Sequence, residues 1–216
     1  MSPLLWSVAA VAFGLLLLFM MNGARRSRHT RQVVLEEVRR RLRGGTIENL
    51  PARGPRARGR LGELELTVDL HHDSSRRSES PMWRVMAVGP VRIDEPIEAR
   101  VADWSGWIDP WMQMEKVLTV PAAGGGPTFT IHARQPMTLH HPVIAALRRQ
   151  GPGLIAGCLH VQHDFMRAEI RYDRRPEANR GLFAFLDAMT EISARGPSRA
   201  VDTGRVHRMH AGRETG

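Results

Sequence analysis

The sequence predicts an α+β fold in which an N-terminal single transmembrane helix precedes a mostly antiparallel sheet with helices on one face. A long apolar run, from Leu4 to Met21, opens the chain. Several short segments after residue 61 alternate apolar and polar residues, as half-buried strands do. Two later segments repeat apolar residues at helical spacing. Because the strand patterns follow one another closely, antiparallel pairing is expected.

The apolar run, "LLWSVAAVAFGLLLLFMM", is long enough to span a bilayer as a helix. A cleaved secretory signal is the alternative, but it needs a basic segment before the run and a small-residue cleavage site after it. The run follows Met-Ser-Pro, and the only small pair nearby, Gly23-Ala24, is followed at once by arginine. We therefore expect a retained signal anchor.

The charges beside the run predict its orientation, because basic side chains next to a span stay on the cytoplasmic side. No lysine or arginine precedes the run. The arginines that closely follow it are Arg25, Arg26, Arg28 and Arg31. The N-terminus should therefore lie outside and the C-terminal domain in the cytoplasm. A single cysteine, Cys158, agrees with a reducing compartment.

The formal charge of +9 is concentrated in one segment. Residues 22–60 hold twelve arginines against three glutamates, and residues 195–216 have a net charge of +3. Residues 61–194 therefore carry 14 basic and 17 acidic residues, a net of −3, which does not favour a nucleic-acid partner. The basic juxtamembrane segment predicts attraction to anionic lipid headgroups. Its arginines are Arg25, Arg26, Arg28, Arg31, Arg39, Arg40, Arg41 and Arg43.

Four segments are predicted along the chain. They are an anchor over 1–22, a basic juxtamembrane helix and linker over 23–60, an α+β domain over 61–194 and a disordered tail over 195–216. Within the second, Val34, Val38 and Leu42 mark a helix that starts at Thr30 as N-cap and stops at Gly44. Its apolar face could lie on the membrane surface or pack on the domain. The stretch "PARGPRARGR" has the composition of a flexible linker.

Strands and helices are predicted in the order β-β-β-β-β-α-β-β-α. The strand patterns cover 62–70, 82–89, 96–103, 114–120, 128–133, 158–162 and 166–172, and the helices cover 142–150 and 176–193. The Gly124–Gly126 triplet lies between two strands and predicts a hairpin tip, since a phosphate-binding loop needs a helix after it.

The stretches "TFTIHARQPMTLHHPVIAALRRQ", "MRAEIRY" and "GLFAFLDAMTEISA" form a pattern of apolar residues over the last third of the chain. This pattern resembles the C-terminal part of uncharacterised bacterial membrane-anchored proteins. These place a strand pair, a short helix, a hairpin and a final helix after one or two membrane spans. The resemblance implies a domain of unknown function and supplies no catalytic residue.

Candidate metal ligands occur in three separate histidine-containing stretches. Zinc needs three or four converging ligands, and on a strand His160 and His163 would point to opposite faces. A composite site gathered from loops is the alternative. Its candidates are His71, Asp73, His140, His160 and His163. His140 and His141 precede Pro142 and are expected to shape a helix start. Cys158 and His160 would share a strand face, but a buried, inert cysteine is expected.

The segment "DWSGWIDPW" places three tryptophans in a turn-rich stretch. They are Trp104, Trp107 and Trp111, with Trp83 on a predicted strand. Tryptophan is enriched at interface hot spots and at membrane–water boundaries, so these rings are candidate binding residues. Alternatively they fold inward and seal one end of the sheet. We expect Trp83 to be buried and Trp107 to be the most exposed.

These observations predict an uncharacterised single-pass membrane protein whose cytoplasmic domain acts as an interaction or scaffold module. The expected partners are a bilayer with anionic headgroups and a protein still to be identified, and no cofactor is predicted. The alternative is a membrane-tethered, metal-dependent hydrolase that uses the loop histidines.

Overall fold

The computed structural model describes residues 3–51, 54–71, 81–91, 93, 95–101, 104 and 114–194, with side chains from Ala12 onwards except those of Ala123 and Pro152. Its helices are α1 (Pro3–Arg41), α2 (Pro142–Arg149) and α3 (Arg180–Ala194). Its strands are β1 (Arg43–Leu50), β2 (Gly54–Leu61), β3 (Leu64–His71), β4 (Met82–Val88), β5 (Ile97–Val101), β6 (Glu115–Pro121), β7 (Thr128–Ala133), β8 (Gly157–Gln162) and β9 (Phe165–Arg171). Short 3₁₀ turns lie at Ala123–Gly125, Gly151–Gly153 and Pro176–Asn179.

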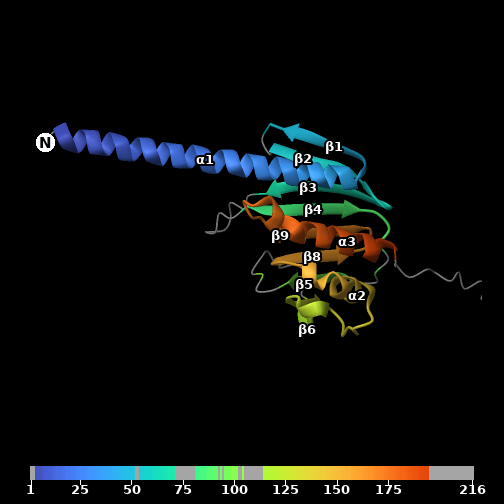
Figure 1. The fold of residues 1–216 in the computed structure, drawn as a ribbon. Coiled ribbons are helices and arrows are strands. Elements are labelled where there is room, and N and C mark those ends of the chain that lie inside the picture. The colour runs from blue at the N-terminus through green and yellow to red at the C-terminus, as the bar shows by residue number, and fades with distance from the viewer. Residues whose placement is uncertain are drawn as a thin grey trace, which may run out of the picture.

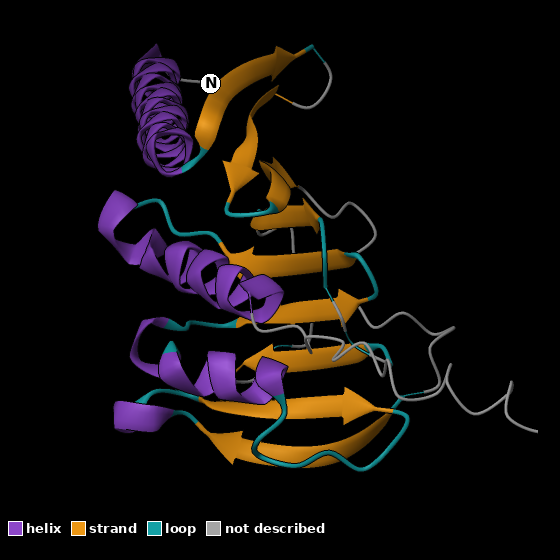
Figure 2. Cartoon of the chain, turned by 90° about the vertical axis from the view of Figure 1, so that its right-hand side faces the viewer, coloured by secondary structure: helices purple, strands orange, loops and turns teal. Residues whose placement is uncertain are grey.

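The nine strands form one antiparallel sheet in the order β1-β2-β3-β4-β9-β8-β5-β7-β6. Figure 1 shows β1 and β6 at its two edges, and Figure 2 shows the helices on one side of it. The predicted α+β class, antiparallel sheet and single helical layer are confirmed. The β8–β9 hairpin lies between β4 and β5. It therefore joins the part of the sheet formed by β1 to β4 to the part formed by β5, β7 and β6.

The core lies between the sheet and the helices. It forms because apolar residues alternate with polar residues along the strands, so that the apolar side chains of one sheet face lie against the helices. In β3 the side chains of Leu64, Leu66, Val68 and Leu70 are buried, as predicted. Successive strand residues face opposite sides, so the residues between them lie on the face without helices. Trp83 on β4 is fully buried, which confirms its predicted position.

Helix α1 is one continuous helix of 39 residues. Its C-terminal part packs on the sheet through the buried side chains of Val34, Leu35, Val38 and Leu42. The tertiary structure therefore decides that this apolar face covers the domain. The prediction that Thr30 is an N-cap is wrong, since Thr30 lies inside α1 and its hydroxyl donates to the Arg174 carbonyl. The predicted stop at the glycine pair is confirmed, because α1 ends at Arg41.

The basic segment predicted to be a linker forms the edge hairpin β1–β2, which is a correction of the sequence interpretation. In β2, arginines alternate with small residues, and Ala57 is fully buried. At Gly59 an added Cβ would lie 2.9 Å from the Leu42 Cβ. Small residues permit this close approach of α1, and the helix supplies the apolar bulk that the strand lacks. This is why the hydrophobic pattern of the segment does not reveal a strand.

The remaining predicted elements are confirmed within one to four residues. Helix α2 begins after His141, whose Nδ1 accepts a hydrogen bond from the Val143 backbone N–H at 3.3 Å. This confirms the expected role of His141 at the helix start, and the role of His140 stays a prediction. The glycine-rich tip joins β6 to β7 through a 3₁₀ turn, also as predicted. The tail predicted over 195–216 lies outside the described residues.

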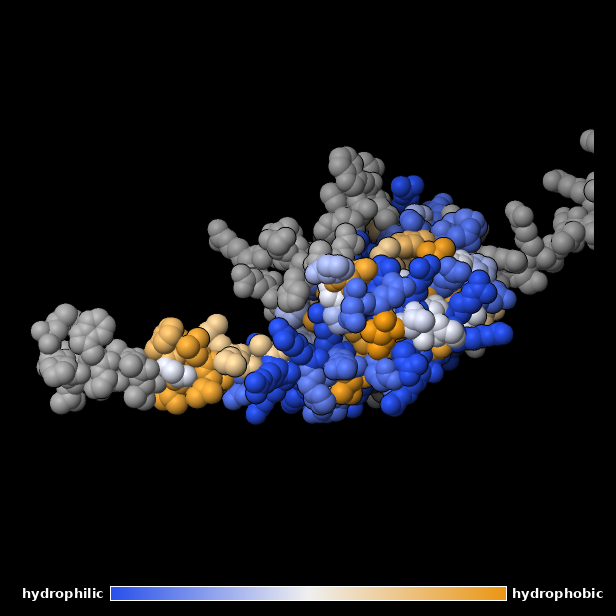
Figure 3. Space-filling view, turned by 90° about the horizontal axis from the view of Figure 1, so that it is seen from above, coloured by the Kyte–Doolittle hydropathy of each residue, from blue (hydrophilic) through white to orange (hydrophobic). Residues whose placement is uncertain are grey.

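The N-terminal half of α1 leaves the domain, as Figure 1 shows. Its exposed large apolar side chains are Phe13, Leu15, Leu16, Leu17, Leu18, Phe19, Met20 and Met21. Figure 3 shows them as an apolar cluster outside a largely hydrophilic domain surface. Within the part of the chain that the structure describes, no helix has the length and apolar character needed to cross a membrane.

Candidate functional site

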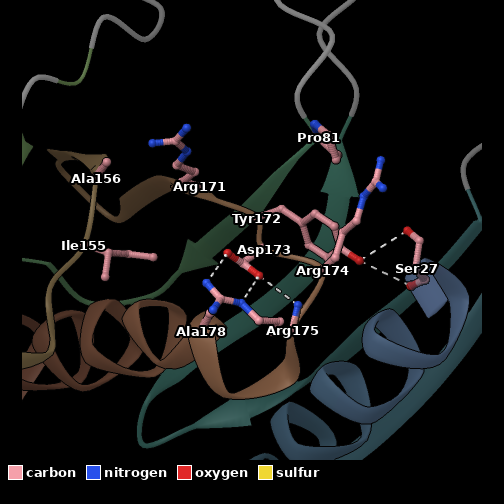
Figure 4. Close-up of a pocket in the computed structure, with 10 residues that line it drawn as sticks. All are labelled: Ser27, Pro81, Ile155, Ala156, Arg171, Tyr172, Asp173, Arg174, Arg175 and Ala178. Atoms are coloured by element: carbon pink, nitrogen blue, oxygen red, sulfur yellow. Dashed lines mark hydrogen bonds and ion pairs between the residues drawn. The ribbon is translucent and has the colours of Figure 1, made fainter. Parts of the chain in front are cut away.

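A cavity of about 880 Å³ lies where β9 ends beside α1 (Figure 4). Its lining residues are Ser27, Pro81, Ile155, Ala156, Arg171, Tyr172, Asp173, Arg174, Arg175 and Ala178. They come from α1, the residue before β4, the segment before β8, the last residue of β9, the four residues that follow β9 and the 3₁₀ turn that precedes α3. The cavity is therefore at the end of the sheet from which the apolar half of α1 projects.

Helix α1 is fixed at this cavity by contacts with the residues that follow β9. The Tyr172 hydroxyl lies 3.2 Å from the Ser27 Oγ and donates to the Ser27 carbonyl at 3.3 Å. One turn further along, the buried Thr30 hydroxyl donates to the Arg174 carbonyl. The Tyr172 ring packs edge-on against Trp83, with 5.7 Å between ring centroids. These contacts hold the segment that follows β9, which contains Arg174 and Arg175, against α1.

A buried asparagine shapes the backbone of the same segment. Asn179 is fully buried, and its Oδ1 accepts from the Trp83 indole N–H at 2.7 Å and from the Asp173 backbone N–H at 3.1 Å. Its Nδ2 donates to the carbonyls of Asp173 at 2.9 Å and Arg175 at 2.7 Å. The amide thus has all four of its hydrogen-bonding positions filled. The loop that carries the arginines is held in one conformation by this side chain.

The cavity has an excess of positive charge. Arg175 donates to Asp173 from its side chain at 3.1 and 3.2 Å and from its backbone N–H at 2.8 Å. These side-chain and backbone hydrogen bonds lower the pKa of the Asp173 carboxyl. The side chains of Arg171 and Arg174 are exposed and form no ion pair with any described residue. Among the described residues, these two guanidinium groups at the cavity therefore have no salt-bridge partner, although Arg171 also lowers the pKa of the Asp173 carboxyl through its charge.

The basic juxtamembrane segment divides into two groups in the structure. Arg25, Arg26 and Arg28 are exposed on α1 and flank Ser27, which contacts the domain through Tyr172. Arg31 Nη2 donates to the Pro55 carbonyl at 3.2 Å, and burial lowers the pKa of its guanidinium. The second group is part of the domain surface. Its members are Arg39, Arg40 and Arg41, which form ion pairs with glutamate or aspartate, and Arg43, which is the first residue of β1.

On the sheet face opposite the helices, charged side chains lie at paired positions of neighbouring strands. One row runs through Asp69, Arg84, Glu169, Cys158 and Arg100. Its buried carboxylates are all paired with arginine, at 2.8 Å for Asp69–Arg84 and in the Arg167–Glu169 contact. Arg100 of this row binds Glu98 of the neighbouring row at 2.6 Å. Buried, paired charges of this kind order the sheet and offer no free acid or base.

Cys158 is the only cysteine, and the structure makes it a poor nucleophile. It is buried, and burial, followed by the nearby Glu169 and Glu98 carboxylates, raises the pKa of its thiol to about 12. The thiolate is the reactive form, so the thiol is inert at neutral pH. This confirms the expected buried cysteine. His132 nearby has its pKa lowered, by burial first and then by Arg100.

The candidate metal ligands do not converge within the described part of the chain. No group of three or more His, Cys, Asp or Glu side chains there could hold a metal ion. His71 ends β3 in register with Arg171, whereas His163 lies in the β8–β9 turn, about 20 Å away along the strand. His163 contacts Asp164 at 3.1 Å, and both are exposed. His140 is exposed before α2, His160 lies in mid-strand, and Asp73 falls outside the described residues.

Of the three candidate tryptophans only Trp104 is described. It is half-buried, and its indole Nε1 is buried without a hydrogen-bond partner among the described residues. Trp107 and Trp111 lie outside the described part, so the prediction of a tryptophan contact surface stays a prediction.

The sequence interpretation did not identify the residues that form the cavity. Its strand pattern stopped at Tyr172, and Arg171, Arg174 and Asn179 were not singled out. The available signal was the stretch "RYDRRPEANR", which gathers four arginines directly after a strand. Clustered cations at a strand end favour a surface site, but only the tertiary structure brings them beside α1.

The chain matches no protein-family model, no curated protein and no solved structure.

Proposed function

We propose that this chain is a single-pass membrane protein whose α+β domain is a non-catalytic binding module held at the membrane surface. The observation that carries the proposal is the form of α1. One helix joins a C-terminal half, packed on the sheet, to an N-terminal half whose described large apolar side chains are exposed.

The exposed half of α1 supports membrane attachment on energetic grounds. Phe13, Leu15 and Phe19 are 61%, 62% and 77% exposed. Burying each such side chain in an apolar phase is worth about 1.5–3 kcal/mol. The predicted apolar run begins at Leu4, ahead of the first described side chain, and its eighteen residues as a helix extend about 27 Å. A hydrocarbon core is about 30 Å thick.

The charges beside this helix support a cytoplasmic domain. Arg25, Arg26 and Arg28 directly follow the apolar residues, are exposed, and form no ion pair with any described residue. Unpaired arginines at the end of a span favour retention on the cytoplasmic side and attraction to anionic lipid. Continuity of α1 with the domain then holds the cavity near the membrane.

A binding role fits the described residues better than hydrolysis. The rival hypothesis requires a metal centre, and no group of three or more candidate ligands comes together among the described residues. The cavity instead offers exposed guanidinium groups and tyrosine and serine hydroxyls, a composition that suits recognition of an anionic group.

The test is membrane attachment and topology of the full chain. We expect the wild type to remain with membranes after carbonate washing and the domain to be digested by protease added to inside-out vesicles. The double substitution Leu16→Arg and Phe19→Arg should release the chain, because each arginine in a span costs about 2.5–3.5 kcal/mol.

A matched control substitutes arginine for two exposed apolar residues of the domain. Met86→Arg with Val88→Arg, at residues 39% and 53% exposed on β4, should leave attachment unchanged. A soluble wild type, or a Leu16→Arg/Phe19→Arg chain that stays in the membrane, contradicts the proposal.

A further inference from the structure

We propose that Arg171 and Arg174 form a binding site for a phosphate group, supplied by the headgroup of an anionic lipid in the membrane that holds α1. The inference rests on the proposed function for the source of the phosphate and on the cavity for its recognition.

The position of the cavity along α1 matches the depth of lipid headgroups. Ser27, the cavity residue on α1, lies six residues after Met21, the last exposed apolar residue of the projecting half. Six helical residues span about 9 Å. The headgroup region on each side of a bilayer is about 5–8 Å thick. An anchored α1 therefore places the cavity at the outer boundary of the headgroups, within reach of a phosphate.

The charge balance of the cavity favours an anion. Asp173, the acidic lining residue, is neutralised by Arg175 through both its side chain and its backbone. Figure 4 shows the side chains of Arg171 and Arg174 extending away from that pair. Guanidinium groups bind phosphate oxygens in pairs of parallel hydrogen bonds, so each of these arginines offers a binding position for phosphate at the cavity.

The site is also pre-organised. Asn179 fixes the carbonyls of Asp173 and Arg175, and the Thr30 hydroxyl binds the carbonyl between them, that of Arg174. A backbone held in place from both sides loses little conformational freedom when a ligand binds. A volume of about 880 Å³ is larger than a phosphate requires and accommodates the glycerol that a lipid headgroup adds.

The arginines of α1 would act with this site. Arg25, Arg26 and Arg28 are exposed within two turns of the cavity residue Ser27. They supply long-range attraction to the anionic surface, whereas Arg171 and Arg174 supply a cavity in which one headgroup is held. Removing the cavity arginines should thus weaken selective binding and leave membrane attachment intact.

The experiment uses the full chain in a neutral detergent. Native mass spectrometry measures the fraction that carries phosphatidylglycerol or phosphatidylcholine at equal lipid concentrations. We expect phosphatidylglycerol to be preferred and the double substitution Arg171→Gln and Arg174→Gln to weaken its binding about 30-fold. Arg171→Lys with Arg174→Lys, which keeps both charges, should retain part of the preference.

The matched control removes two exposed arginines that are remote from the cavity and form no ion pair with any described residue. Arg58→Gln with Arg134→Gln should leave phosphatidylglycerol binding within about twofold of the wild type. Equal loss in the control, or no preference for phosphatidylglycerol in the wild type, overturns the site.

A soluble ligand is tested in the same preparation with sn-glycerol 3-phosphate. If this compound displaces phosphatidylglycerol at equal concentration, the lipid source is overturned and the cavity binds a free phosphate ester. Carbonate washing of membranes separates the two proposals. If the Arg171→Gln/Arg174→Gln chain stays in the membrane but loses its preference for phosphatidylglycerol, the binding site is supported. If the wild-type chain is released, the proposed membrane anchor is contradicted and the binding site is not.

Discussion

The indole N–H of Trp83 donates to the side-chain oxygen of Asn179 at 2.7 Å, and both residues are fully buried. The bond connects β4 to the 3₁₀ turn before α3, across 96 positions of sequence. Through its other hydrogen bonds, Asn179 also holds the segment that joins β9 to that turn. One amide thus links the sheet, the last helix and the cavity.

Asn179→Ala should lower the free energy of unfolding by about 3 kcal/mol. The substitution leaves the buried indole N–H of Trp83 and the carbonyls of Asp173 and Arg175 without their partner, and each buried unsatisfied group costs about 1–3 kcal/mol. Urea titration measures the loss. Asn49→Ala, at an exposed position of β1, is the control and should change stability by less than about 0.5 kcal/mol.

Thr30→Val tests the attachment of α1 to the domain. Valine keeps the shape of the buried threonine and removes the hydroxyl that binds the Arg174 carbonyl, so we expect a loss of about 1 kcal/mol. Amide hydrogen exchange of α1 near Thr30 should accelerate. Thr46→Val, at an exposed position of β1, should leave that exchange unchanged. Equal exchange in both variants would show that the bond does not hold the helix.

Gly181→Ala should destabilise the contact between α3 and the segment before β8. A Cβ added at Gly181 would lie 2.1 Å from the Ile155 Cγ1, so Ile155 must move. The expected cost is about 1–2 kcal/mol, since overpacking outweighs the gain in helix propensity. Adding Ile155→Ala removes the overlap, and a double-mutant cycle by thermal melting should show favourable coupling. Gly23→Ala, with no atom within 4 Å of its added Cβ, should cost nothing.

The raised pKa of the Cys158 thiol predicts that the folded chain loses stability at alkaline pH. Its thiol pKa is raised from 9.0 to about 12 in the folded chain, whereas the unfolded thiol ionises near its ordinary value. Between these two values the folded state binds one more proton than the unfolded state, so stability falls as the pH rises from about 9 towards 12. Cys158→Ala should flatten this decrease in melting temperature.

The same thiol gives an independent measurement by labelling. Iodoacetamide should modify the native chain at neutral pH at a rate set by unfolding, and modify the denatured chain rapidly. Because the chain has one cysteine, the label reports this position alone. Rapid native labelling would contradict the buried, protonated thiol.

The sequence by itself determined the elements whose own residues carry a periodic apolar signal. Leu64, Leu66 and Val68 alternate on β3, and the apolar residues of α2 and α3 recur at helical spacing. Such faces must be buried wherever the chain folds, so their local pattern is sufficient to predict strands, helices and an antiparallel α+β fold.

Only the tertiary structure decided the parts whose apolar partner lies elsewhere in the chain. Hairpin β1–β2 has small residues where other strands have large ones, and it becomes a strand pair because Leu35, Val38 and Leu42 of α1 cover it. The cavity likewise depends on Ser27 meeting Tyr172, 145 positions apart. Local periodicity contains no information about such distant contacts, since their free energy arises only when the two segments pack together.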